Sequence, residues 1–562
     1  MASKLYLEEE IKEREQELES NSDALCVGTL SLSAYSSSAR AAMLTQHLVQ
    51  AVTPTHPEIP GVFTGHENLF GKFSGTYCKT ESKLEVIHKI VKFEGYSYTL
   101  VVYDPKAKMY DIIQRNEVKE KAESCGFRYN NTEIDKYEEG DIIKKGKMLY
   151  SSPTLDEYEN FRYGKNANVV YVISQETIED AVSIREGFAK QFKYTKVESE
   201  KVPINDNDIP LNMYGDSMVY KSFPDIGEWT KKSILCATRR KNKLTDQYGL
   251  KNNNLRKIFP NDSVYQVHGD YQMVDINIWS NKDIDDIPDL KSYSQIKKYY
   301  KKILKYWQEV YDNLGKIIEF SKLQGKSYSQ ELSRLYAKAR DVLDPTCRWT
   351  ENDRMFSNMI VEFTFAKEEP LRKGSKVSGR FGNKSIVSYI IPDDEMGVTE
   401  DGIVPDIRID ALGILARLNS GQLFEQELNW VAKSVKDRML KMKNDSDKEK
   451  ILFKFMNMVN SKQCNSLIDY CSALSQSEKV EFMQEILTDR IYIHQEPLES
   501  ITGDGMRKLY EEFKPKKTTI RLKDSDGEYN ILRDIIVAEE YIIRLNNLTH
   551  LAGKGQLNNL LN

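Results

Sequence analysis

The sequence predicts a mixed α+β protein made of several domains, and three patterns support this prediction. Short runs that alternate apolar and polar residues, typical of β-strands, recur between residues 96 and 245. A long amphipathic stripe over residues 290–343 is typical of paired helices. Two more strand-like runs flank a glycine-rich loop at residues 374–385. A chain of 562 residues has room for roughly three or four domains with large cores.

The N-terminal part of the chain predicts two helices. Residues 1–20 are mostly polar, as expected of a helix that is solvated or that docks on a partner. Residues 38–52 repeat their apolar positions along one helical face. His47 shares that face, and a lone histidine in such a place indicates a structural role.

The segment that follows predicts β-structure. Tyr96–Tyr103 and Met109–Ile113 alternate as strands, and Asp104-Pro105 supplies a turn between them. Met273–Trp279 predicts another strand ahead of the helical stripe. The adjacent carboxylates Glu179-Asp180 are, on their own, more typical of a solvated face than of a site.

Residues 290–343 predict a helical hairpin. Gly325 interrupts the stripe, Ser327 with Gln330 can cap a second helix, and Pro345 follows its end. The opposite side of the first helix carries five lysines: Lys297, Lys298, Lys301, Lys302 and Lys305. Three alternatives stay open for these lysines, namely contact with RNA, contact with a promoter-specificity protein and exposure to water, of which the last is favoured.

The glycine-rich loop is the stretch richest in chemistry. Gly374-Ser-Lys-Val-Ser-Gly-Arg-Phe-Gly-Asn-Lys-Ser385 holds three glycines and three cations without an acid, which suits an anion such as phosphate. Gly374 and Gly379 have the spacing of a P-loop, but Arg380-Phe381 stands where that motif needs Lys-Ser/Thr. The loop also joins strand to strand, whereas a P-loop opens a helix. A P-loop nucleoside triphosphatase is therefore disfavoured, and a basic hairpin loop stays the simplest alternative.

Composition narrows the class of protein. The net charge is −5 and the isoelectric point about 6.0, so any contact with nucleic acid must come from local patches or from an assembly. The seven cysteines form no Cys-x2-Cys pair, which argues against a structural zinc site and for a reducing compartment. No apolar run is long enough for a membrane span, and the charged start is no signal peptide.

The acidic run at 524–528 lacks EF-hand spacing and predicts a hairpin turn.

The segment from Gly374 to Gln422 closely resembles the β subunit of multisubunit RNA polymerases. That family reads near GDKxxGRHGNKG and LGVPSRMNxGQ here, and this chain has matching residues in the same order. The matches are Gly374–Ser388, Pro392–Met396, Asp401-Gly402, Pro405–Ile407, Leu412-Gly413, Ala416-Arg417 and Asn419–Gln422. Phe381 and Ser385 replace the usual histidine and glycine. Residues 38–52, 64–67, 163–181, 225–242 and 517–548 resemble further β-subunit segments.

The resemblance implies a fold and a set of domains. The expected fold is a mixed α+β, multidomain one, with a double-psi-like β-barrel core and a flap-like insertion that holds the helical hairpin. The expected domains are an N-terminal segment that joins a partner (1–60), a β-rich core (61–260), the flap-like region (261–358), the catalytic loop and barrel (359–430), and a helical and β segment (431–562).

The resemblance also implies site residues. Lys376 and Lys384 would contact the RNA 3′-end nucleotide or initiating phosphates, and Arg40 and Arg417 would face the incoming triphosphate. Other residues expected to contact nucleotide or nucleic acid are Arg380, Gln50, Asn383, Gln422 and Lys554, the last being a weak substitute for a family histidine. Glu179 and Asp180 match an acidic pair near the second, nucleotide-borne magnesium.

The resemblance further implies partners. It covers roughly the C-terminal half of β, as in the split polymerases of giant tailed bacteriophages. The aspartate triplet that holds Mg²⁺ in the family lies on β′ and has no match here, so the chain is expected to be inactive alone. Expected partners are the other β half, β′-like chains, a promoter-specificity subunit, DNA, RNA and nucleoside triphosphates, in the infected host's cytoplasm or in the virion. A non-catalytic nucleic-acid-binding or scaffold protein with the β fold is the alternative.

Overall fold

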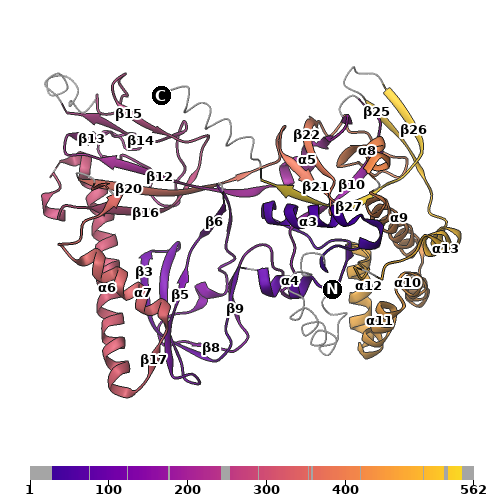
Figure 1. The fold of residues 1–562 in the computed structure, drawn as a ribbon, viewed down its shortest axis with the longest axis horizontal. Helices are drawn as coiled ribbons and strands as arrows, with labels where there is room; N and C mark the ends of the chain where they lie inside the picture. The colour runs from indigo at the N-terminus through magenta and orange to yellow at the C-terminus, as the bar shows by residue number, and fades with distance from the viewer. Residues whose placement is uncertain are drawn as a thin grey trace. The chain divides into compact units, whose positions relative to one another are not determined.

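The chain divides into two compact units that interleave along the sequence (Figure 1). The computed structural model describes residues 28–74, 76–122, 124–174, 177–241, 254–288, 290–351, 354–355, 358–417, 419–497, 499–523 and 529–546. The first unit, called the barrel unit, falls within Met1–Gly75, Pro153–Tyr194 and Glu369–Asn562. The second, called the hairpin unit, falls within Thr76–Ser152 and Thr195–Glu368. Five segments were expected from the sequence, and their boundaries stay predictions.

Six strands of the barrel unit close into a barrel. In order around it they are β10 (Gly164–Val172), β23 (Ile407–Asp410), β11 (Ala181–Arg185), β22 (Lys384–Ile391), β21 (Lys376–Ser378) and β27 (Val537–Leu545). The pairs β10–β23 and β11–β22 are parallel, and the other neighbours are antiparallel. Strand residues alternate between faces, so Val169 and Val170 pack in two separate hydrophobic clusters. The predicted α+β fold with a barrel is confirmed.

Helices complete the barrel unit. They are α3 (Ser38–Gln50), α4 (Glu67–Ser74), α5 (Glu186–Gln191), α8 (Ala411–Arg417), α9 (Ser420–Lys441), α10 (Asp445–Val459), α11 (Ser461–Ala473), α12 (Gln476–Thr488) and α13 (Gly503–Phe513). The predicted helix over 38–52 is therefore confirmed as α3, while residues 1–20 lie outside the described residues. Asn444 and Asn460 cap α10 and α11, and Ser475 with Glu478 forms a capping box on α12. These caps explain why residues 445–488 break into three short helices.

Short strands pair around these helices. β1 (Val62–Phe63) runs parallel to β24 (Ile493–His494). β25 (Thr518–Lys523) and β26 (Tyr529–Ile535) form an antiparallel pair. The predicted hairpin is therefore present, although its turn at 524–528 lies outside the described residues.

The described residues of the hairpin unit form mostly antiparallel sheets, with one short parallel pair, and the two α-helices of the helical hairpin. One sheet has the order β16 (Gln272–Ser280), β20 (Met359–Glu369), β12 (Tyr194–Ile204), β7 (Cys125–Arg128) and β6 (Val118–Ala122). Another has β17 (Ser327–Tyr328), β5 (Met109–Arg115), β4 (Ser97–Asp104), β3 (Leu84–Phe93) and β8 (Ile142–Ile143). Smaller sheets pair β13 (Asp208–Pro210), β14 (Ile234–Arg240) and β15 (Ser263–Gln266), then β2 (Tyr77–Lys79) with β9 (Met148–Ser151), and β18 (Thr350–Glu351) with β19 (Arg354–Met355). The strands predicted at 96–103, 109–113 and 273–279 are confirmed as β4, β5 and β16.

The helical hairpin is confirmed as α6 (Ser294–Gln324) and α7 (Gln330–Leu343). Gly325 ends α6 in the left-handed region, with φ of 64°, where glycine carries no Cβ penalty. The predicted cap at Ser327 is wrong. Ser329 caps α7 by accepting a hydrogen bond from the amide of Leu332, while Ser327 is drawn into strand β17 against β5.

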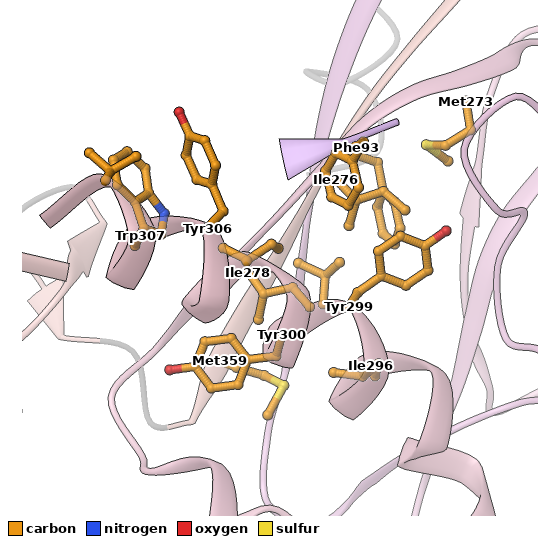
Figure 2. Close-up of a cluster of buried hydrophobic side chains, with 14 of the residues drawn as sticks. Phe93, Met273, Ile276, Ile278, Ile296, Tyr299, Tyr300, Tyr306, Trp307 and Met359 are labelled. Carbon is orange, nitrogen blue, oxygen red and sulfur yellow. The ribbon is translucent and has the colours of Figure 1, made fainter. Parts of the chain in front are cut away.

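The apolar stripe of α6 forms the core of the hairpin unit. Figure 2 shows Ile296, Tyr299, Tyr300, Tyr306 and Trp307 gathered with residues of the neighbouring strands. Those strand residues include Phe93, Met273, Ile276, Ile278 and Met359. Burial of each large side chain contributes roughly 1.5–3 kcal/mol, so this stripe is the main attachment of the hairpin.

Shortening Ile303 to valine is expected to lower the stability of this unit modestly. Ile303 lies on the buried stripe and is 2 % exposed. Loss of one buried methylene lowers the free energy of unfolding by about 0.5–1.5 kcal/mol. Differential scanning calorimetry would register a small fall in melting temperature, whereas Lys316→Ala on the exposed side should change it less. Equal behaviour of the two variants would contradict the packing described.

No helix in the described segments combines the length and the apolar character needed to cross a lipid bilayer.

Candidate active site

Two parallel strands bring the acidic pair and the glycine-rich loop to one end of the barrel, called the barrel rim. β11 begins at Ala181, immediately after Glu179-Asp180, and β22 begins at Lys384. Ala181 pairs with Ile386, and the Ile386 amide donates to the Asp180 carbonyl oxygen at 2.9 Å. Because parallel strands start at the same edge, the acidic turn lies beside the start of the strand that carries Lys384.

Helix α8 starts at the same rim. Val172, at the end of β10, pairs with Asp410, at the end of β23. The Asp410 carboxylate accepts hydrogen bonds from the amides of Leu412 and Gly413, both at 3.1 Å, and so holds the first turn of α8. A Cβ on Gly413 would lie 3.8 Å from the carbonyl oxygen of Glu179. The acidic turn and the helix that ends at Arg417 are therefore neighbours, although the side chain of Arg417 lies outside the described part of the chain.

The acidic turn has a strained backbone. Glu179 has φ of 57°, in the left-handed region that non-glycine residues seldom occupy. Such a conformation is unfavourable by roughly 1–2 kcal/mol. Both carboxylates are exposed. The turn thus presents two acids to solvent at a place where the fold holds them against backbone preference.

The glycine-rich loop is tightly packed at the rim. Gly382 has φ of 70°, and a Cβ there would come within 3.0 Å of Arg40 Cδ. A Cβ on Gly379 would come within 2.7 Å of the Asn383 amide. Phe381 is fully buried. Glycine at these two positions is needed for space and, at Gly382, for backbone geometry.

Helix α3 packs its cationic end on this loop. Arg40 Nη1 donates to the Gly382 carbonyl oxygen at 2.8 Å. About two turns further along the helix, His47 Nδ1 lies 3.1 Å from Ser378 Oγ. The fold therefore joins Arg40 to the loop that the sequence places some 340 residues away.

Lys376 and Lys384 lie on the same face of the β21–β22 hairpin. Lys376 pairs with Ile386, and Ser378 pairs with Lys384. Residues opposite each other in an antiparallel ladder point to the same side, so both lysines share the face that Ser378 presents to His47. Lys384 is exposed and Lys376 half-buried. Within the described part of the chain, no carboxylate lies within ion-pairing distance of either ammonium.

The positive charges of Lys384 and Arg40 act on the pKa of His47. Burial lowers the pKa of His47, and the positive charges of Lys384 and Arg40 lower it further, to about 4. The imidazole is therefore neutral at physiological pH. An anion bound at the rim would meet the same two charges.

A pH titration tests this field. Because the folded pKa of His47 lies below the unfolded value near 6.5, protons bind the unfolded chain first. Stability from this group is complete above pH 6.5 and falls as the pH drops toward 4, by about 2 kcal/mol at pH 5. The difference in unfolding free energy between wild type and His47→Gln should shrink accordingly. By NMR, Lys384→Ala is expected to raise the pKa of His47. An unchanged pKa would show that the charge of Lys384 does not act on this imidazole.

Arg380 does not face solvent. It is fully buried, and its Nη2 donates to Glu425 Oε1 at 2.6 Å. Burial alone would lower the pKa of the guanidinium, but the Glu425 charge outweighs it and the pKa is raised. The guanidinium also lies 5.5 Å from the centre of the Tyr541 ring. This setting favours a structural role over the predicted contact with nucleic acid, because the group is already paired and shielded.

The other predicted binding residues are placed unequally. Gln422 is buried and donates to Glu540 Oε2 at 3.0 Å, and Asn383 is buried within the loop. Gln50 is exposed at the end of α3, where its carbonyl oxygen accepts from the Asn546 amide at 2.9 Å. Lys554 lies outside the described residues. The rim therefore gathers Arg40, Lys376 and Lys384 with the acidic turn, and it leaves Gln422 and Asn383 in the interior.

Comparison with known proteins identifies the family of the chain. The family model for RNA polymerase Rpb2, domain 6, matches residues 109–511. The chain belongs to this RNA polymerase Rpb2 family. It is similar to the DNA-directed RNA polymerase subunit beta of Oceanobacillus iheyensis, with 23 % identity over 411 residues, covering 69 % of this chain and 29 % of that protein. The predicted resemblance to β is confirmed.

Two other β subunits show the same extent of similarity. The subunit beta of Orientia tsutsugamushi is 22 % identical over 494 residues, covering 73 % of this chain and 35 % of that protein. The subunit beta of Geobacillus thermodenitrificans is 24 % identical over 411 residues, covering 69 % and 28 %. The chain thus spans about a third of the length of these Rpb2-family relatives.

The structure also reveals a buried polar seam between α9 and the barrel of this Rpb2-family chain, called the α9 seam. Its α9 residues are Gln422, Glu425, Gln426 and Asn429. Their barrel partners are Glu540, the Tyr541 amide, the Val169 carbonyl and the Glu539 carbonyl, in that order. Burial raises the pKa of Glu540 to about 8, and Tyr171 also hydrogen-bonds to it. The spacing 422, 425, 426, 429 marks one helical face, and this signal was available in the sequence.

The α9 seam is a dense group of buried polar side chains in the barrel unit, but it is not a group of metal ligands. In the part of the chain that the structure describes, no three histidine, cysteine or acidic side chains gather as metal ligands. Glu179 and Asp180 are two exposed oxygen donors, which suits Mg²⁺ bound largely through water and other ligands. They fit a supporting place beside a metal held elsewhere.

Proposed function

We propose that this chain is a subunit of a DNA-directed RNA polymerase, equivalent to the C-terminal part of β, and that it supplies the cationic side of the active site. One observation carries the proposal. Arg40, Lys376 and Lys384 come from α3, β21 and β22, and the fold gathers them at one barrel rim with the acidic turn. Membership of the Rpb2 family supports the same function.

The cations would act on phosphate. Nucleotidyl transfer builds negative charge on the phosphate oxygens, and fixed cations in a site of low dielectric stabilise that charge. Lys384 and Lys376 would contact the RNA 3′-end nucleotide or initiating phosphates. The Arg40 guanidinium has five N–H donors, and one of them is used in the hydrogen bond to Gly382. The others would be available to the incoming triphosphate, which Arg417 would also contact.

Magnesium would be held mainly by a partner. The 562 residues contain no counterpart of the family's aspartate triplet, so a β′-like chain would supply the principal ligands. Bound Mg²⁺ would neutralise charge on the reacting phosphates. Glu179 and Asp180 would accept hydrogen bonds from water on the second metal, which explains their exposure at the rim.

The finer assignments follow from the same resemblance. The six-stranded barrel would be a double-psi-like barrel, and residues 261–358 would act as a flap. The partners would be another β half and β′-like chains, as in giant bacteriophage polymerases, with a promoter-specificity subunit as a further candidate. Such an enzyme would work on DNA in the cytoplasm of an infected host or enter the virion.

Co-expression with candidate partner chains tests the proposal. A tag on this chain is used for purification, and Mg²⁺-dependent incorporation of labelled nucleotides is measured on a DNA template. We expect template-dependent RNA from the complex and none from the chain alone. A complex that assembles and binds template, yet makes no RNA under any metal condition, would favour the non-catalytic alternative. A stable monomer that recruits no partner would overturn the proposal.

A further inference from the structure

The hairpin unit holds a second basic feature, which the proposed chemistry does not use. A groove of about 630 Å³ lies between α6 and β3, and it is called the α6 groove. Phe93 from β3 and Tyr299 and Tyr306 from α6 line it. Figure 2 shows these three rings in the apolar cluster, Phe93 on the strand and both tyrosines on the helix. Each of the three side chains is 6 % exposed, so the base of the groove is made of packed core residues.

Lysines line the α6 side of the groove. Lys298, Lys302 and Lys305 stand on successive turns of the helix and are exposed. Among the described residues, no carboxylate lies within ion-pairing distance of Lys298 or Lys302. Lys305 has Glu309 at 3.6 Å, but its side chain is 78 % exposed, and such a surface pair contributes little. These three charges are therefore available to a ligand.

Three of the other charged groups of the groove are already engaged, whereas the exposed carboxylate of Glu94 has no ion pair in the described part of the chain. Lys89 pairs with Glu138 at 2.6 Å, and Lys92 pairs with Asp275 at 2.8 Å. Asp225 pairs with Lys221 at 2.6 Å and accepts from Tyr299 Oη at 2.9 Å. With three available lysines against Glu94, the net charge that the groove offers to a ligand is positive, and the lysines are arranged in a row.

The row matches a strand of phosphates. With a rise of about 1.5 Å per residue, Lys298 and Lys302 are about 6 Å apart along the helix, and Lys305 is about 4.5 Å further. Neighbouring phosphates of a single nucleic-acid strand have a comparable separation. Beside the row, Tyr96 is half-buried and Val91 is 41 % exposed, which gives the face of a base an apolar surface.

We propose that the α6 groove binds a single strand of nucleic acid, with Lys298, Lys302 and Lys305 on the phosphodiester backbone. One row of cations matches the phosphates of one strand, whereas a duplex presents two rows of phosphates. Of the three alternatives that the sequence leaves open for these lysines, this proposal selects contact with nucleic acid. This binding does not depend on the proposed polymerase activity, because the groove needs no partner chain.

Salt-dependent binding by the full chain tests the proposal. Fluorescence anisotropy follows labelled ten-nucleotide uridylate and deoxythymidylate strands, and a matching duplex, over a range of KCl concentrations. A Lys384→Ala background reduces binding at the barrel rim. The groove variant is Lys298→Gln, Lys302→Gln, Lys305→Gln, and the matched control is Lys301→Gln, Lys316→Gln, Lys322→Gln. The control lysines lie on the same helix, are exposed and stand outside the groove.

We expect the groove variant to weaken single-strand binding at least tenfold and the control to change it much less. The slope of log affinity against log salt should fall by about 2 for the groove variant, because each phosphate contact on a single strand contributes roughly 0.7. Preference for uridylate or equal binding of both strands supports the proposal, the former adding a contact to the 2′-hydroxyl. Equal losses in the two triple variants, or tighter binding of the duplex, would overturn it.

The same variants separate this inference from the proposed function. In the assembled complex with Lys384 intact, the groove variant should retain nucleotide incorporation on a short template, while strand binding falls. Loss of incorporation with unchanged strand binding would instead mean that the groove lysines do not hold a strand. Failure of every complex to make RNA would touch the proposed function alone, since the binding assay needs no catalysis.

Discussion

Replacing Lys384 with alanine in the proposed polymerase complex is expected to lower nucleotide incorporation by about 10²–10³-fold. The ammonium is exposed at the barrel rim and has no acidic partner among the described residues, so the fold does not depend on it. Its charge nevertheless reaches the interior, because it lowers the pKa of His47. Removing it takes a fixed cation from the place where phosphate charge would develop.

The matched control is Lys373→Ala. Lys373 is exposed and precedes β21, at the end of the β21–β22 hairpin opposite its turn at residues 379–383. Single-turnover incorporation should be nearly unchanged in this variant and in Lys384→Arg, which keeps the charge. If Lys384→Ala assembles normally and transcribes at the wild-type rate, the rim is not the phosphate site.

The strand, loop and hairpin patterns are local, and for that reason the sequence predicts them. Strands β20 and β22 alternate around a glycine-rich loop, and the α6 stripe repeats every three or four residues. The cap of α7 was misplaced by two residues, because Ser327 and Ser329 both have the required chemistry. Only the pairing of Ser327 with β5, about 220 residues away, decides between them.

In the candidate site too, features carried by a local pattern or motif were predicted, and features set by long-range contacts were not. Family resemblance places Arg40 and Lys384 in one site, and the packing of α3 on the loop brings them together. The α9 seam was missed, because its partners on β10 and β27 lie more than 100 residues from α9. Nothing in the motif distinguishes a cation that faces a ligand from one that is buried, and Arg380 is the case in point.

Replacing Arg380 with methionine is expected to destabilise the barrel unit by about 3–5 kcal/mol. The substitution leaves the Glu425 carboxylate fully buried without its counter-ion, and only the Tyr541 amide, at 3.1 Å, still donates to the same oxygen. Urea denaturation followed by circular dichroism would show a lower midpoint. The double variant Arg380→Met, Glu425→Gln should recover most of the loss, because the amide keeps an acceptor for Tyr541 and removes the charge.

The outcome decides between two roles for the same cation. A residue that contacts nucleic acid would lose strand affinity on substitution while the unfolding midpoint stayed unchanged. A buried structural residue would lose stability first, and its affinity would return in the charge-free double variant. Because the guanidinium is enclosed by Glu425 and Tyr541, we expect the second result. Arg380 would then hold the loop between Gly379 and Asn383 in shape, and Lys384 at its end would meet the phosphate.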